Sequence, residues 1–263
     1  IIASWGEPGK RDSGDRSAKS EADWAGAISN LIAKMDAQGV KKMLLMGPPR
    51  VAENTDSREL SKLKRWTAQH PDRLYFLGGG NDLNPLIHQF AASEVDEEIK
   101  EDFAAKAEDL ARSGIKGFGE MAAMHLSLNP QHPSEQQPPD HPLFLLLTDI
   151  AAKHDLPIDL HMEALPEDAQ TPAGVLRAGP KNSGKLSANI HAFERLLAHN
   201  PKTRIVWQHI GWDNVGYASA DLVGHLLAVH PNLYVALRVE ERLQRVGGDG
   251  PMPNRLVEPN GTI

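Results

Sequence analysis

The chain has 263 residues, of which 40% are hydrophobic, enough to bury one large core. Its formal net charge is −7 and its basic residues are scattered, which argues against nucleic acid as a partner, because a phosphate-binding surface needs clustered Lys and Arg. The sequence contains no cysteine and no run of about 18 apolar residues, so we expect no disulfide, no thiolate chemistry, no cysteine-bound zinc and no membrane-spanning helix.

One pattern, an amphipathic helix followed at once by a short apolar strand, recurs six times along the chain. The repeats cover residues 28–47, 60–79, 103–121, 144–163, 192–211 and 222–239. In the first repeat, the helix ends at Gln38 and Gly39 and the strand follows over residues 43–46. Regular alternation of helices and strands predicts βα units built on a parallel sheet.

The connections from strand to helix are longer than the turns from helix to strand, and the two longest span residues 121–142 and 162–189. Long loops at the carboxyl ends of parallel strands form the functional face of an α/β barrel. We therefore expect a (β/α)8, TIM-barrel-like fold, with residues 1–263 in a single domain. A dinucleotide-binding sheet is the alternative, but residues 78–80 lack the third spaced glycine of its G-x-G-x-x-G motif.

Most of the twelve histidines have ordinary explanations. Helix-to-strand turns hold His70, His154, His199 and His230, helices hold His88, His191 and His225, and a Pro- and Gln-rich loop holds His132 and His141. We expect structural, surface or solvated positions for all of these. By contrast, His161 and His209 each end an apolar strand, and Glu120 stands at the matching position of a third strand. Two imidazoles and a carboxylate converging from strand ends predict a site for a divalent metal.

The segments GFGEM, DLHME and VWQHIGWD, in this order and with a helix between each pair, resemble the amidohydrolase superfamily. The resemblance covers residues 30–239, or strands two to seven of the barrel, and is greatest to the amidohydrolase-related TIM-barrel hydrolases, with TatD-like enzymes as cousins. It implies that Glu120, His161 and His209 bind a divalent cation at the barrel mouth, zinc first, with manganese or iron as alternatives. It also implies a metal-bound hydroxide that attacks an ester, lactone or amide.

Two parts of the family pattern do not occur in this sequence. The family's first strand ends in His-x-His, whereas Trp5 and Glu7 stand at that place if the strand begins at Ile1. No eighth strand with its metal-binding aspartate is predicted after residue 239. We therefore expect the barrel to be incomplete at strands one and eight, and truncated at both ends, within this chain.

Further polar and aromatic residues are expected around the barrel mouth. Arg50 and Arg238 each follow a predicted strand, where a guanidinium would pair with a substrate carboxylate or lie on the surface. Trp212 is expected either to stack on a substrate ring or to pack within the protein, and Glu163 to contact the substrate or support a metal ligand. Asp213 is expected first to cap the next helix, with hydrogen bonding to a ligand as the alternative that makes it the candidate catalytic residue.

The predicted function is a metal-dependent hydrolase of a small organic molecule. A decarboxylase of the same superfamily is one alternative, and a metal-free barrel with a binding role is another. The expected partner is a small-molecule substrate, with neither nucleic acid nor membrane, while self-association into a homo-oligomer stays open. We expect a soluble protein of the cytoplasm or the periplasm.

Overall fold

The structure is a computed structural model that describes residues 21–56, 59–128, 133–210 and 213–237. Its helices are α1 (Glu21–Ala37), α2 (Glu59–Ala68), α3 (Asn84–Gln89), α4 (Glu97–Arg112), α5 (Pro142–Lys153), α6 (Ala173–Ala178), α7 (Ile190–His199) and α8 (Ala220–Val229), with 3-10 turns η1 (Ala52–Asn54) and η2 (Ala92–Glu94). Its strands are β1 (Met43–Leu45), β2 (Leu74–Phe76), β3 (Gly78–Gly79), β4 (Phe118–His125), β5 (Glu135–Gln136), β6 (Ile158–Met162), β7 (Ala169–Gln170), β8 (Lys185–Leu186), β9 (Ile205–Ile210) and β10 (Leu233–Leu237). Within these described ranges no helix has the length and apolar character needed to cross a membrane.

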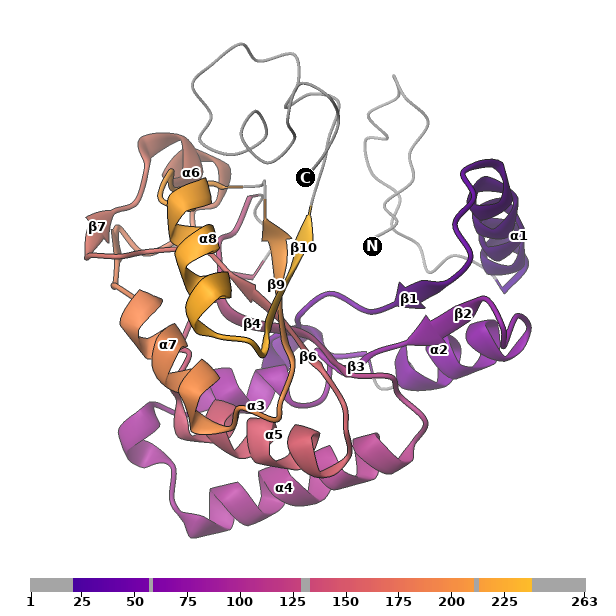
Figure 1. The fold of residues 1–263 in the computed structure, drawn as a ribbon, viewed down its shortest axis with the longest axis horizontal. Helices are drawn as coiled ribbons and strands as arrows, with labels where there is room; N and C mark the ends of the chain where they lie inside the picture. The colour runs from indigo at the N-terminus through magenta and orange to yellow at the C-terminus, as the bar shows by residue number, and fades with distance from the viewer. Residues whose placement is uncertain (1–20, 57–58, 129–132, 211–212, 238–263) are drawn as a thin grey trace.

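The principal strands are parallel, and their order in space follows their order in the chain (Figure 1). β1 pairs with β2, and a second sheet has the order β10-β9-β6-β4-β3. Only Leu77 separates β2 from β3, and its N–H donates to the carbonyl of Leu45 at 2.9 Å, so the two sheets continue one another. This order is that of a barrel wound in one direction, whereas the strand order of a dinucleotide-binding sheet reverses.

The α/β class and the predicted strands are confirmed. The six repeats end in β1, β2, β4, β6, β9 and β10. Among the described residues β1 and β10 each pair with a single neighbour, so this row of strands is open at both edges. The two long connections also hold short elements that the sequence did not predict, namely β5, the antiparallel pair β7–β8 and α6.

Strand alternation divides the main sheet into two chemically different faces. Ile158 and Leu160 of β6 are 2% and 0% exposed in the core beneath the helices. Beside them, Trp207 packs edge-on against Phe193 of α7, with 5.3 Å between ring centroids, and its Nε1 donates to the carbonyl of Met162 at 2.8 Å. Because successive residues of a strand point to opposite faces, the residues between these apolar positions face away from the helices. That face carries the candidate site.

A smaller core supports the N-terminal strands. Buried Ile28, Leu31 and Met35 of α1 pack on Leu74 of β2. Figure 1 shows α1 and α2 beside β1 and β2, at the edge of the molecule opposite α7 and α8. The first strands of the row are therefore covered by helices in the same way as the later ones.

Candidate metal centre

Three ligand-type side chains meet where β4, β6 and β9 lie side by side. Glu120 belongs to β4, His161 to β6 and His209 to β9, and these strands are consecutive neighbours in the sheet. Oε1 of Glu120 accepts hydrogen bonds from Nδ1 of His161 at 3.1 Å and from Nε2 of His209 at 2.9 Å. One potential ligand atom from each residue lies within 4.8 Å of the others. The structure therefore brings together the three residues that the sequence predicts as metal ligands.

A β-bulge explains how His209 reaches this cluster from the end of its strand. In the β9–β10 ladder Trp207 pairs with Val235, but Ile210 pairs with Leu237, so β9 contains one extra residue between these pairs. His209 lies in this interval and has a φ of 61°, in the left-handed region that residues with side chains seldom adopt. A bulge breaks strict alternation and re-aims a side chain, which places His209 on the face of the site. Such backbone conformations are concentrated at functional sites.

The electrostatics of the cluster are those of a buried ion pair. Glu120 is 1% exposed, and although burial alone would raise the pKa of its carboxyl, the hydrogen bonds and charges of His161 and His209 lower it below the ordinary range. Burial alone would lower the pKa of His161, but the hydrogen bond and charge of Glu120, helped by Glu163 and Glu135, raise it. In the metal-free protein Glu120 is therefore ionised and His161 tends to hold an extra proton.

The cluster has the chemistry to hold a divalent cation. Oε2 of Glu120 is buried and has no hydrogen-bond partner among the described residues. A bound cation would satisfy this oxygen, whose burial without a partner otherwise carries a free-energy cost. Two imidazole nitrogens and a carboxylate oxygen form a donor set suited to zinc, manganese or iron.

The family of the chain is decided by a sequence comparison. The sequence model of the family described as Amidohydrolase matches residues 88–257, more than half of the chain. The chain belongs to the amidohydrolase family. The matched region contains Glu120, His161 and His209, and the resemblance seen in the sequence is confirmed.

Solved structures similar to this chain include two decarboxylases and one protein described as a probable hydrolase. The 2,6-dihydroxybenzoate decarboxylase from Rhizobium is 14% identical, with a TM-score of 0.44 over 93% of this chain and 69% of its own. The 5-carboxyvanillate decarboxylase from Novosphingobium aromaticivorans, solved with manganese, is 18% identical, with a TM-score of 0.42 over 76% of this chain and 51% of its own. A probable 2-pyrone-4,6-dicarboxylic acid hydrolase from Acinetobacter baumannii is 14% identical, with a TM-score of 0.41 over 90% of this chain and 66% of its own.

The chain therefore spans between 51% and 69% of the length of these three proteins. Identities of 14% to 18% do not assign any of their reactions to it. No curated protein matches the chain.

Two residues predicted at the site organise the loop after β9. Glu163 is 4% exposed and accepts hydrogen bonds from the backbone N–H of Asn214 at 3.2 Å and from its side-chain amide. Asp213 accepts from three backbone N–H groups in the turn over residues 215–218, at 2.7 to 2.9 Å. Ser219, not Asp213, is the N-cap residue of α8, so the alternative that Asp213 caps the helix is wrong. Both carboxylates hold the loop in place.

Arg50 retains hydrogen-bonding capacity after its contacts within the chain. Its Nη2 lies 3.3 Å from Oε2 of Glu59, while its Nε is buried and has no partner among the described residues. A guanidinium with an uncommitted donor is suited to binding a carboxylate. Trp212 and Arg238 lie outside the described residues, so their roles stay predictions.

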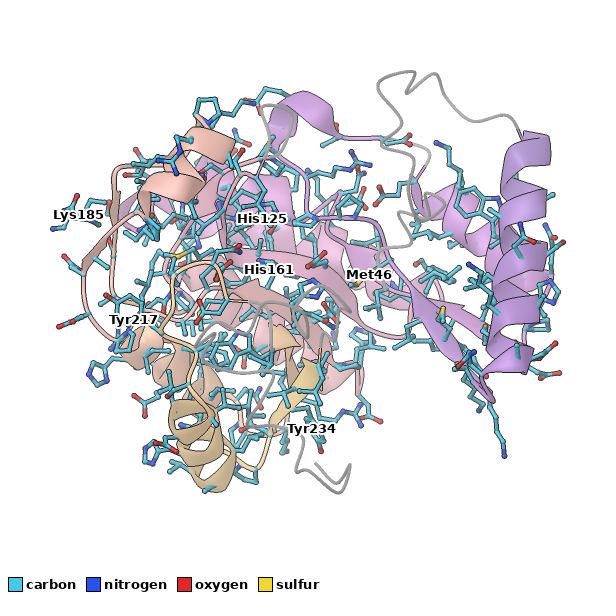
Figure 2. The ribbon with its side chains drawn as sticks, turned by 90° about the horizontal axis from the view of Figure 1, so that it is seen from above. Met46, His125, His161, Lys185, Tyr217 and Tyr234 are labelled. Atoms are coloured by element: carbon cyan, nitrogen blue, oxygen red, sulfur yellow. The ribbon has the colours of Figure 1, made fainter. Side chains whose placement is uncertain are left out.

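Sequence reasoning assigned no role to His125. The predicted strand stopped at residue 121, whereas β4 continues to His125 because its end pairs with β5. The ring of His125 lies 4.9 Å from that of His161, and its Nδ1 donates to the carbonyl of Pro133 at 3.0 Å. Figure 2 shows His125 and His161 beside each other near the middle of the molecule. The sequence did contain a signal for His125, because this histidine follows closely after the predicted strand that holds the ligand-type residue Glu120.

Asp159 is a second buried polar residue that sequence reasoning missed. It is 7% exposed, accepts a hydrogen bond from the side chain of Gln208, and leaves Oδ1 without a partner among the described residues. Burial, with the charge of Glu120 in addition, raises the pKa of Asp159 to about 7. Its spacing of two residues from His161 was the available signal, because residues two apart on a strand share a face.

Proposed function

We propose that this member of the amidohydrolase family is a metal-dependent hydrolase of a small organic molecule that carries an ester, lactone or amide bond. The observation that supports the proposal is the convergence of Glu120, His161 and His209 from three neighbouring strands, with ligand atoms within 4.8 Å of one another. A structural ion pair would need one imidazole for one carboxylate. Here two imidazoles share one carboxylate oxygen, and within the described part of the chain the other oxygen has no hydrogen-bond partner.

Glu120, His161 and His209 would hold the cation, zinc first, with manganese or iron as alternatives. When bound, such a cation lowers the pKa of a water molecule and polarises a carbonyl group. Before binding, both imidazoles donate N–H groups to Glu120, so each of these nitrogens must give up its proton, to solvent or to the other nitrogen of the same ring, before it becomes a ligand. Because the pKa of His161 is raised by Glu120, its extra proton must be released when a metal binds, and metal affinity is expected to fall as the pH is lowered.

The residues around the cation site would bind and orient the substrate. Arg50 offers a guanidinium donor to an anionic group, and Trp212 and Arg238 are proposed as further substrate contacts. Glu163 would act indirectly, because its hydrogen bonds to Asn214 fix the loop that follows His209. The three backbone hydrogen bonds to Asp213 favour a role in positioning that loop over direct participation in the chemistry.

Decarboxylation of a small carboxylic acid is the second candidate. It is favoured by the unpartnered Nε of Arg50, because a decarboxylase must hold a carboxylate next to its cation. Both reactions would use the same cation site. Assays of the metal-loaded protein separate them, since a decarboxylase releases carbon dioxide from aromatic or dienoic acids and a hydrolase consumes esters, lactones or amides without releasing it.

The cation site is tested by removing all metal with a chelator and adding back zinc, manganese or iron in separate samples. We expect one cation per chain, measured by metal analysis after gel filtration. When cobalt is used, we expect the visible absorption of the bound cobalt ion to show imidazole and carboxylate ligands. His161→Asn, His209→Asn and Glu120→Gln should each weaken binding by about tenfold or more.

His199→Asn is the matched control, because His199 lies in α7 and contacts Asp149 at a distance from the cluster. Equal metal binding by His161→Asn and His199→Asn would overturn the proposed site. Failure of the unaltered protein to bind any of these metals would favour a metal-free barrel with a binding role. The gel-filtration volume in the same experiment reports whether the chain self-associates.

A further inference from the structure

A second buried carboxyl group lies close to the proposed cation site. Glu135 opens β5, which pairs antiparallel with the end of β4 and sets Glu135 directly opposite His125. His125 in turn lies against His161, as Figure 2 shows for the two histidines. The side chain of Glu135 is 1% exposed. One residue, His125, therefore separates Glu135 from a proposed ligand.

The orientation of Glu135 is fixed by Asn84, which is fully buried. Oδ1 of Asn84 accepts the backbone N–H of Ala122 at 2.9 Å, so its Nδ2 must be the donor of the remaining contacts. Nδ2 donates to Oε1 of Glu135 at 2.6 Å and to the carbonyl of Arg50 at 3.1 Å. Asn84 thus joins Glu135 to the segment that carries the unpartnered guanidinium nitrogen.

The other oxygen of Glu135 has no such partner. Oε2 is buried and without a hydrogen bond among the described residues. His88 of α3 is a neighbouring basic residue, and its Nε2 lies 3.9 Å from Oε1. That nitrogen donates to the carbonyl of Ala122 at 2.7 Å, and burial lowers the pKa of His88 to about 4, so His88 is neutral.

An ionised carboxylate in this position would have one amide donor and no ion-pair partner other than the more distant charge of His161 to offset its desolvation. Burial accordingly raises the pKa of Glu135 to about 8, with the charge of Glu120 acting in the same direction and Asn84 and His161 opposing it. At neutral pH most molecules carry a neutral carboxyl group. Since Oε1 accepts from Asn84, the proton lies on Oε2.

We propose that Glu135 is a substrate-binding residue that presents its Oε2 hydroxyl as a hydrogen-bond donor to an oxyanion, such as a carboxylate or phenolate, of a small substrate. The inference rests on the proposed function and narrows it to anionic substrates. A neutral carboxyl group can bind an oxyanion where an ionised one would repel it. Glu135 and Arg50, joined through Asn84, then offer two kinds of donor to one anionic molecule.

The test uses benzoate as an anionic probe and benzamide as its neutral counterpart, with binding measured by calorimetry. Protein freed of metal is used, so that no cation can serve as the partner of the anion. Benzoate should bind about tenfold more weakly at about pH 9 than at about pH 6, because the carboxyl group loses its proton between them. Benzamide affinity should change little over this range.

Glu135→Gln keeps the acceptor for Asn84 and replaces the hydroxyl with an amide donor, so benzoate should bind with little pH dependence. Glu135→Ala should bind benzoate weakly at both pH values. The matched control is Glu97→Gln, the same change on a carboxylate exposed at the start of α4, which should behave as the unaltered protein. No benzoate binding to the unaltered protein at about pH 6, or an unchanged pH dependence in Glu135→Gln, would overturn the proposal.

A measurement on the ligand-free protein tests the proposal even if the substituted variants fold poorly. Carbon-13 NMR of protein labelled at the glutamate carboxyl groups should show one resonance that is missing in Glu135→Gln and titrates with a midpoint near 8. A midpoint in the ordinary glutamate range, near about 4.3, would also overturn the proposal. Because these experiments need no metal, they can fail while the cation site is upheld, or succeed while it is refuted.

Discussion

Asn182 and Ser127 are joined by two hydrogen bonds through one side-chain amide. Oδ1 of Asn182 accepts the Ser127 N–H and Nδ2 donates to the Ser127 carbonyl, each at 2.8 Å. The contact ties the connection between β6 and α7 to the segment that follows β4, so the two long loops support one another beside the site.

Replacing Asn182 with Ala should remove both of these hydrogen bonds to Ser127. We expect a loss of about 2–3 kcal/mol in the free energy of unfolding, measured by urea denaturation, with faster amide exchange over residues 169–186. Asn30→Ala is the control, because Asn30 is exposed on α1 and its loss should cost almost nothing. Equal stability of the two variants would show that the Asn182–Ser127 hydrogen bonds contribute little to the free energy of unfolding.

The stability of the metal-free protein should depend on pH through Glu135. Burial raises the pKa of Glu135 to about 8 from a reference value of 4.5, so the folded state holds this proton more tightly than the unfolded state. The stabilising contribution is therefore complete below the unfolded value and is lost as the pH rises from about 4.5 to about 8. The free energy of unfolding of Glu135→Gln should fall less steeply across this window, while Glu97→Gln keeps the original slope. Superimposable slopes for all three proteins would contradict the assignment.

Trp207 links the core to the site through its indole N–H. Trp207→Phe removes the donor to the Met162 carbonyl, next to His161, and should cost about 1–3 kcal/mol of stability. We also expect weaker cobalt binding, because the end of β6 loses a support. Tyr234→Phe is the control, since Tyr234 is 50% exposed on β10. If the Trp207→Phe variant has the same stability and the same cobalt affinity as the unaltered protein, Trp207 does not link the core to the site.

The close contact between β4 and β6 requires glycine at position 119. A Cβ atom at Gly119 would lie 2.7 Å from Cβ of Asp159 and 3.0 Å from a methyl group of Leu77. Gly119→Ala should therefore destabilise the fold by about 1–3 kcal/mol and shift the neighbouring Glu120. Gly224→Ala is the matched control in α8, where no atom lies within 4 Å, and should be neutral or stabilise by up to about 1 kcal/mol. Thermal unfolding of both variants measures the difference.

The parts of this structure that could be predicted are those that local patterns encode. Ile158 and Leu160 alternate with polar residues, and this alternation marks a strand and its buried face. His161 and His209 each place an ionisable imidazole at the end of an otherwise apolar strand, where packing alone does not require one. Their roles as candidate ligands could therefore be predicted from the sequence. The family match covers both residues, and their roles as ligands stay a proposal.

The parts that could not be predicted depend on contacts across the chain. Asn84 and Glu135 are 51 positions apart, and neither stands in a recognisable motif. His141 was expected in solvent but is 0% exposed, because its Nδ1 accepts from the Leu143 N–H at the start of α5 and its Nε2 donates to the carbonyl of Phe90. Nothing in the Pro- and Gln-rich segment around His141 signals a partner so far away in the sequence.

The agreement between strand order and chain order has a consequence for biosynthesis. β2 pairs with β1, and β4, β6, β9 and β10 each pair with the strand of the β10-β9-β6-β4-β3 row that comes before them in the chain, so a chain emerging from the ribosome can extend the sheet without waiting for distant segments. Short sequence separations between paired strands also reduce the loop entropy lost at each step. A ribosome stalled partway along the message would therefore leave an ordered, shorter sheet with one unpaired edge, and that edge is where a chaperone or a neighbouring nascent chain would attach.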